Sequence, residues 1–142
     1  MNKIRIIFLW SALVLSCTND KEAFSKGEKV ESKNFSGEVW VNFLVEKDSI
    51  HDVSIGSVTF APGAKTNWHY HPGGQILLVT KGRGLYQERN GEIREIRAGE
   101  VIKCSPNVEH WHGATDKDSM THMAIGTQLH KGAVVWLEPV EK

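Results

Sequence analysis

The chain has 142 residues, enough for one domain of ordinary size with one hydrophobic core. Lysine plus arginine and aspartate plus glutamate number 17 each, so the formal net charge is zero. This balance excludes a strong overall attraction to nucleic acid or to an anionic membrane surface. We therefore expect a small-molecule partner and no nucleic acid.

Residues 1–17 have the pattern of an export signal. Lys3 and Arg5 are basic, and Ile6–Leu15 is an apolar run too short to span a bilayer as a mature helix. The run ends at Cys17 in the sequence VLSC, which resembles a bacterial lipobox, whose cysteine becomes the lipidated first residue of the mature protein. We expect an exported periplasmic or outer-membrane lipoprotein whose membrane contact is the lipid on Cys17. Plain secretion and an uncleaved anchor are the alternatives.

Residues 18–36 are polar and rich in lysine and glutamate, as expected of a flexible tether. The folded domain is therefore expected at residues 37–142. If Cys17 is lipidated, Cys104 is the only thiol of the mature domain, and an internal disulfide is excluded. Cys104 follows the apolar pair Val101-Ile102, so we expect it to be a small buried side chain.

Short β-rich runs separated by turn residues fill the rest of the chain, and no segment has a sustained helical period. Asn90-Gly91 is the clearest hairpin signal and favours a type I′ turn. So many short strands predict an all-β barrel or sandwich. The expected strands are Val39–Val45, Val53–Phe60, Gln75–Thr80, Gly84–Glu88, Ile93–Ile96, Val101–Cys104, Met120–Thr127 and Val134–Leu137.

Three histidines and a glutamine are candidate metal ligands. His69 and His71 are two residues apart, so on an extended strand their side chains leave the same face. Gln75 follows a Pro-Gly-Gly turn that can redirect the chain, and His110 lies where a turn leads into a strand. Three imidazole nitrogens and one amide oxygen suit first-row transition metals better than Ca²⁺ or Mg²⁺.

The spacing of these residues resembles that of the cupin family. The segment from Gly63 through His69, His71 and Gln75 to Gly82 is similar to the first cupin motif, with glutamine at the usual glutamate position. Residues 99–110 are similar to the second motif. The resemblance covers about residues 37–140. It implies a single-domain cupin, a double-stranded β-helix or jelly-roll barrel, with His69, His71, Gln75 and His110 as metal ligands.

A narrower resemblance points to one subgroup, which includes the manganese-dependent cupin hydroxynitrile lyases of bacteria and cupins associated with carboxymuconolactone decarboxylases. It is carried by the segments Thr59–Gly63, Trp68–Gln75, His110–Ala114 and Met120–His122. It implies Mn²⁺ as the most expected ion, with Fe²⁺, Ni²⁺, Zn²⁺ or Co²⁺ as alternatives. It also implies two further histidines beside the metal, His112 and His122. We expect His122 to act as general base or acid and His112 as a second polar group on the substrate.

The leading hypothesis is therefore a metal-dependent lyase of the cyanohydrin type. Because Gln75 is neutral, the bound ion keeps its full double charge, which favours Lewis-acid over redox chemistry. One alternative is an isomerase or decarboxylase of keto acids or sugar acids, for which Lys65 and Arg83 are the nearby candidate cations. Another is a non-catalytic periplasmic cupin that binds a metal or a small molecule.

Two further expectations concern aromatic and apolar residues. Trp68, Trp111 and Trp136 are expected mainly to pack in the core and at the rim, and Trp68 and Trp111, which adjoin ligands, are candidates for walls of the pocket. The run Val39–Val45 is more apolar than a strand with one wet face requires. We therefore expect it to pack across a subunit interface in a homodimer or higher homo-oligomer.

Overall fold

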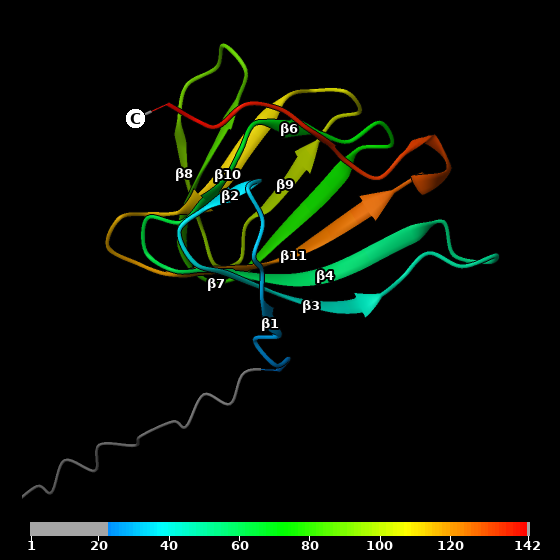
Figure 1. Ribbon diagram of the computed structural model, residues 1–142, viewed down its shortest axis with the longest axis horizontal. Helices are drawn as coiled ribbons and strands as arrows, with labels where there is room; N and C mark the ends of the chain where they lie inside the picture. The colour runs from blue at the N-terminus through cyan, green and yellow to red at the C-terminus, as the bar shows by residue number, and fades with distance from the viewer. Residues whose placement is uncertain (1–22, 142) are drawn as a thin grey trace, which may run out of the picture.

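The computed structural model describes residues 23–141, in which nearly all regular structure is β-strand (Figure 1). One 3-10 helix, η1 (Leu129–Lys131), is the only helical element of these residues, and no helix among them has the length and apolarity needed to cross a membrane. The predicted export signal and Cys17 lie outside the described residues. The strands are β1 (Glu28–Lys29), β2 (Phe35–Ser36), β3 (Val39–Val45), β4 (Val53–Phe60), β5 (Lys65–Thr66), β6 (His69–Tyr70), β7 (Gln75–Glu88), β8 (Arg94–Arg97), β9 (Val101–Cys104), β10 (His110–Ala114), β11 (Met120–Thr127) and β12 (Val135–Trp136).

The strands curl into two antiparallel layers that share β7. In one layer the order is β1-β3-β4-β11-β7, with β9 also paired to β7. In the other layer β7 pairs with β8 and β10, and β10 continues to β5 and β6. Figure 1 shows β3, β4 and β11 below and β2, β6 and β10 above. The expected all-β barrel is confirmed.

A single bent strand, β7, joins the layers because glycine allows a sharp corner at Gly82. The sequence predicts two strands here, Gln75–Thr80 and Gly84–Glu88, whereas the structure has one of 14 residues. Gly82 has a φ of 73°, and a Cβ on it would stand 1.9 Å from the carbonyl oxygen of Ser119. The pairing of β7 with β11 shifts register beside this corner, between Thr121 and His122.

The interior is filled by alternate residues of the strands, as the two-residue period of β-structure requires. Phe60, Leu77 and Met120 have no exposed surface. Cys104 is 3% exposed, and burial raises the pKa of its thiol to about 11. Its expected role as a small buried side chain is therefore confirmed.

The N-terminal boundary of the barrel differs from the expected one. The sequence predicts a flexible tether at residues 18–36, but within that range β1 pairs with β3 and β2 pairs with β5. Phe35 packs its ring against Phe60 and Trp136, at centroid distances of 6.4 Å and 5.3 Å. Phe35, an aromatic residue in a polar segment, thus packs this part of the chain against the barrel. The folded region therefore begins before Gly37.

The hairpin between β7 and β8 is present, but its turn is not of type I′. A type I′ turn needs a positive φ at both central residues. Asn90 has a φ of 65°, but the φ of Gly91 is not positive. The Gly91 N–H donates to the carbonyl of Glu88, so Asn90 occupies the third position of a four-residue turn.

Candidate metal centre and its cavity

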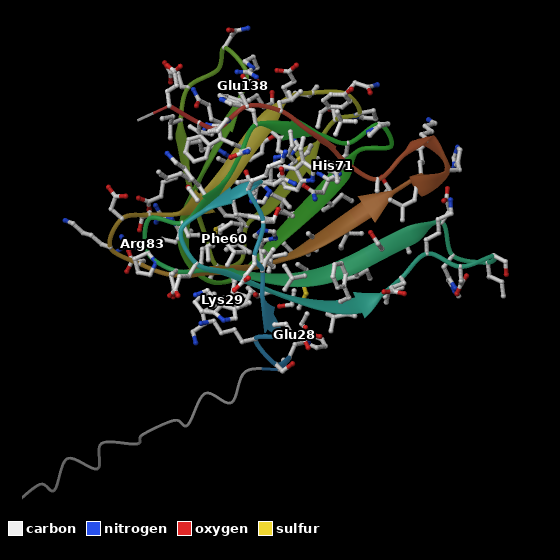
Figure 2. All side chains as sticks on the ribbon, in the orientation of Figure 1. Glu28, Lys29, Phe60, His71, Arg83 and Glu138 are labelled. Atoms are coloured by element: carbon white, nitrogen blue, oxygen red, sulfur yellow. The ribbon has the colours of Figure 1, made fainter. Side chains whose placement is uncertain are left out.

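Three of the four predicted ligands meet inside the barrel. His69 lies on β6, His71 follows it, and His110 lies on β10 directly opposite His69 in the antiparallel register. Each histidine offers one ring nitrogen as a ligand atom, and these three nitrogens all lie within 4.8 Å of one another. Figure 2 shows His71 between the two layers.

Backbone carbonyls fix the tautomer of each of these imidazoles. The Nδ1 atoms of His69, His71 and His110 pair with the carbonyl oxygens of Asn67, Ala133 and Val108, at 2.9 Å, 2.6 Å and 2.9 Å. A carbonyl accepts hydrogen bonds and does not donate them, so Nδ1 carries the proton in each ring. The Nε2 atoms are left with their lone pairs, which is the form that binds a metal.

Gln75 supplies the fourth candidate atom. The chain reaches it through the turn Pro72-Gly73-Gly74, where a Cβ on Gly73 would stand 2.0 Å from the Thr127 carbonyl oxygen. Gln75 is 8% exposed, and its side-chain Oε1 has no hydrogen-bond partner among the described residues. The same holds for Nε2 of His71 and of His110. Buried polar atoms left without partners are costly unless a ligand satisfies them. The site therefore fits a divalent metal.

Burial keeps the ligand imidazoles neutral. It lowers the pKa of His110 to about 4 and holds the pKa of His69 well below its usual 6.5, with neighbouring His110 adding to the shift. Burial also lowers the pKa of His71. Protons therefore compete weakly with a metal at neutral pH.

A cavity of about 280 Å³ opens beside the ligands. His112 on β10 and His122 on β11 both line it, with ring centroids 4.8 Å apart. His122 has no exposed surface, and neither of its ring nitrogens has a hydrogen-bond partner within the described chain. The Nδ1 of His112 also lacks one.

Burial lowers the pKa of His122 to about 4 and holds that of His112 well below 6.5. Both predicted catalytic histidines thus face the same cavity as neutral bases.

The cavity has no charged wall. No lysine, arginine, aspartate or glutamate of residues 23–141 lines it. Lys65 instead lies over the Trp111 ring, 5.4 Å from its centroid, and Arg83 pairs with Asp118 at 2.9 Å. Figure 2 shows Arg83 at the outer edge of the molecule. The two candidate cations for an acidic substrate are therefore outside the site.

Trp68 and Trp111 are buried, as mainly expected, and neither is among the aromatic walls of the cavity. Trp68 and Trp111 point away from the cavity: Trp68 lies under the Arg89 guanidinium, and the indole N–H of Trp111 donates to Gln87. The walls come from residues that were not predicted to line the site. They are Phe35, Phe43, Phe60 and Trp136, joined by the aliphatic Val41, Val58, Leu129 and Val134.

Comparison with known proteins agrees with this geometry. The Cupin domain family model matches residues 56–126, and the chain belongs to the cupin family. A protein of Granulicella tundricola named (R)-mandelonitrile lyase is 45% identical over 106 residues, which cover 75% of this chain and 81% of that protein.

Solved structures show the same fold. A cupin-like protein of Thermotoga maritima superposes with a TM-score of 0.83 at 44% identity, over 86% of this chain and 92% of that one. A Klebsiella pneumoniae protein with a double-stranded β-helix domain has a TM-score of 0.64 at 22% identity, covering 84% of this chain and 99% of that one. The second likeness supports the fold alone.

Proposed function

We propose that the protein is a metal-dependent lyase that cleaves cyanohydrins into an aldehyde and hydrogen cyanide. The observation that carries this proposal is His122, a fully buried base with no hydrogen-bond partner for its ring nitrogens among residues 23–141, which faces an uncharged cavity beside three histidines suited to a metal. The similarity to the (R)-mandelonitrile lyase of Granulicella tundricola supports the same substrate class.

The cavity suits a neutral aromatic substrate. Its aromatic and aliphatic walls would bury the ring of a mandelonitrile-like molecule, and ring–ring contacts add to the gain from burial. A carboxylate would enter a cavity without a lysine or arginine among its described lining residues, which argues against the keto-acid and sugar-acid alternatives.

His122 moves the proton in the proposed reaction. The one unprotonated ring nitrogen of neutral His122 takes the hydroxyl proton as the oxygen forms a double bond to carbon. The carbon–carbon bond to the nitrile breaks, and its electron pair leaves on cyanide. The imidazolium then returns the proton to cyanide, so that His122 ends neutral and hydrogen cyanide departs. His112, 4.8 Å away between ring centroids, orients the substrate through its unpaired Nδ1.

His69, His71, Gln75 and His110 would hold the metal, and we propose Mn²⁺. A divalent ion there supplies positive charge that stabilises the negative charge developing on the substrate. Because Gln75 is an amide, the ligand set leaves that charge undiminished.

Turnover of mandelonitrile tests the proposal. Protein loaded with Mn²⁺ is expected to release benzaldehyde and cyanide in equal amounts, measured by absorbance and by a cyanide electrode. His122→Ala is expected to lose at least about 100-fold in rate, the usual contribution of a general base. His51→Ala, which changes an exposed histidine outside the cavity, is the matched control and should retain the wild-type rate.

Two results would overturn the proposal: no product above the buffer blank, or a His122→Ala variant as fast as the control. Azide separates the enzyme from a metal-binding protein without catalysis. An open coordination position predicts that azide changes the electron paramagnetic resonance spectrum of bound Mn²⁺, whereas a closed site predicts no change.

We also propose that the protein is an exported lipoprotein anchored at Cys17 and that it associates as a homodimer. The export signal and the apolar run Val39–Val45 support these proposals. Labelling of the protein by radioactive palmitate in cells, lost in Cys17→Ala, tests the anchor. Light scattering of the purified domain tests the dimer.

A further inference from the structure

The C-terminal part of the chain crosses the open end of the barrel after the region that matches the family model. We call Gln128–Glu138 the crossing segment; Figure 1 shows it leaving β11 and running back past β6. It gives the cavity Leu129, Val134 and Trp136. Its far end is fixed by β12, which pairs with β6, and by the Leu137 N–H, which donates to the Trp68 carbonyl at 2.8 Å.

The crossing segment also orients His71, one of the proposed metal ligands. The carbonyl of Ala133 accepts the Nδ1–H of His71 at 2.6 Å and so fixes both the tautomer and the direction of that ring. Ala133 itself belongs to no strand. On the N-terminal side of Ala133 the nearest backbone bonds, from Lys131 to Gln128 and from Gly132 to Leu129, lie within the crossing segment, and on its C-terminal side the pairing of β12 with β6 begins at Val135. The bonds on the N-terminal side fix the shape of the segment but not its position against the barrel.

Two contacts tie the start of the crossing segment to the rest of the barrel: Gln128 Nε2 donates to the Gly73 carbonyl at 3.4 Å, and His130 contacts Asp52. The backbone N–H of His130 donates to Asp52 Oδ1 at 3.0 Å, and His130 Nδ1 pairs with Asp52 Oδ2. Lys47 adds an ion pair to the same carboxylate at 2.9 Å. The hydrogen bond from the His130 ring is the largest cause that lowers the pKa of Asp52, to about 2. Asp52 lies just before β4, so the contact joins the β3–β4 loop to the crossing segment.

We propose that Asp52 and His130 are positioning residues for the metal site. They hold the crossing segment so that the Ala133 carbonyl aligns His71 for the ion. This proposal rests on the metal site and not on the lyase reaction. The pair is exposed, with side-chain exposures of 40% and 61%, so it adds little to the stability of the fold. Its effect is expected in metal affinity.

The same loop offers a matched control. Asp48 pairs with His51 and accepts the backbone N–H of His51, just as Asp52 does with His130, but both partners lie in the β3–β4 loop. Asp48→Ala thus removes an equivalent exposed Asp–His contact without loosening the crossing segment. Asp52→Asn is the conservative variant, because its amide oxygen still accepts the His130 N–H.

Titration of the metal-free full-length protein with Co²⁺, followed by visible absorption, tests the proposal. Asp52→Ala is expected to bind Co²⁺ about tenfold more weakly than Asp48→Ala, the usual cost of losing a group that orients a ligand. Asp52→Asn is expected to recover most of that affinity. Melting temperatures of the metal-free Asp52→Ala and Asp48→Ala variants should agree within a few degrees.

Equal Co²⁺ affinities for Asp52→Ala and Asp48→Ala would overturn the proposal, and so would a wild-type protein that binds no Co²⁺. Failure of the lyase proposal looks different. In that case the wild type and the Asp48→Ala variant bind Co²⁺ tightly, the Asp52→Ala variant binds it weakly, and mandelonitrile is not cleaved by the Mn²⁺-loaded wild type.

Discussion

His69 and His110 face each other across the β6–β10 pair, with ring centroids 4.4 Å apart. Each has its Nδ1 proton directed to a backbone carbonyl two residues before it, Asn67 for His69 and Val108 for His110. Two strands that share only a short stretch of pairing thus present two lone pairs to one point. A metal held there would join β6 to β10.

Metal binding should therefore stabilise the fold. Mn²⁺ at 100 times its dissociation constant is expected to raise the free energy of unfolding by about 2.7 kcal/mol, because the unfolded chain does not assemble the site. His110→Ala is expected to lose this gain, whereas His51→Ala keeps it. Urea denaturation with Mn²⁺ and with a chelator measures the difference. A gain of equal size in His110→Ala would contradict the proposed ligand set.

The cluster of His69, His71 and His110, which could hold a metal ion, was predictable because these residues follow the spacing of the cupin motifs and imidazole is a chemically distinctive ligand. Strands β3, β4, β9 and β11 were predictable with their observed bounds, since turn residues bound them and they are rich in β-forming apolar residues. The cavity walls depend on contacts that sequence spacing does not record. Phe35 comes from a polar segment, Trp136 from a strand of two residues, and Ala133 acts through its backbone carbonyl, which has no side-chain signature.

The substitution Gln75→Glu tests whether residue 75 binds the metal and whether the missing negative charge of glutamine matters for the reaction. Without metal, the variant buries a carboxylate that lacks a partner, so we expect a lower melting temperature for the metal-free protein. With Mn²⁺, the added negative charge should tighten binding and reduce turnover of mandelonitrile by about tenfold, because it cancels part of the ion's charge. Calorimetric titration and initial rates measure the two effects.

Gln87→Glu is the matched control for this change. It makes the same substitution on the same strand, β7, but Gln87 bonds to Trp111 outside the cavity. We expect it to leave Mn²⁺ affinity and turnover unchanged. If Gln75→Glu also leaves both unchanged, Gln75 is not a ligand.

The stability of the metal-free protein should fall in mild acid because of its buried histidines. His110 and His122 have folded-state pKa values of about 4, against 6.5 as the ordinary value. Between pH 6.5 and 4 the unfolded chain therefore binds more protons than the folded protein. Their contribution to stability is complete above pH 6.5 and is lost as the pH falls toward 4, at about 1.4 kcal/mol per pH unit for each histidine.

Urea denaturation of the chelator-treated protein at a series of pH values measures this slope. The variant His122→Gln should have a smaller slope of stability against pH, reduced by the contribution of one histidine, because glutamine does not titrate. The pKa of the Asp52 carboxyl is lowered to about 2, so the stability that this group contributes is lost below the range of pH 6.5 to 4. A stability that stays constant from pH 6.5 to 4, or that rises as the pH falls, would mean that the histidines take up protons without unfolding and that the interior is open to water. Under that result His122 would not be the dry, neutral base that the cyanohydrin reaction requires.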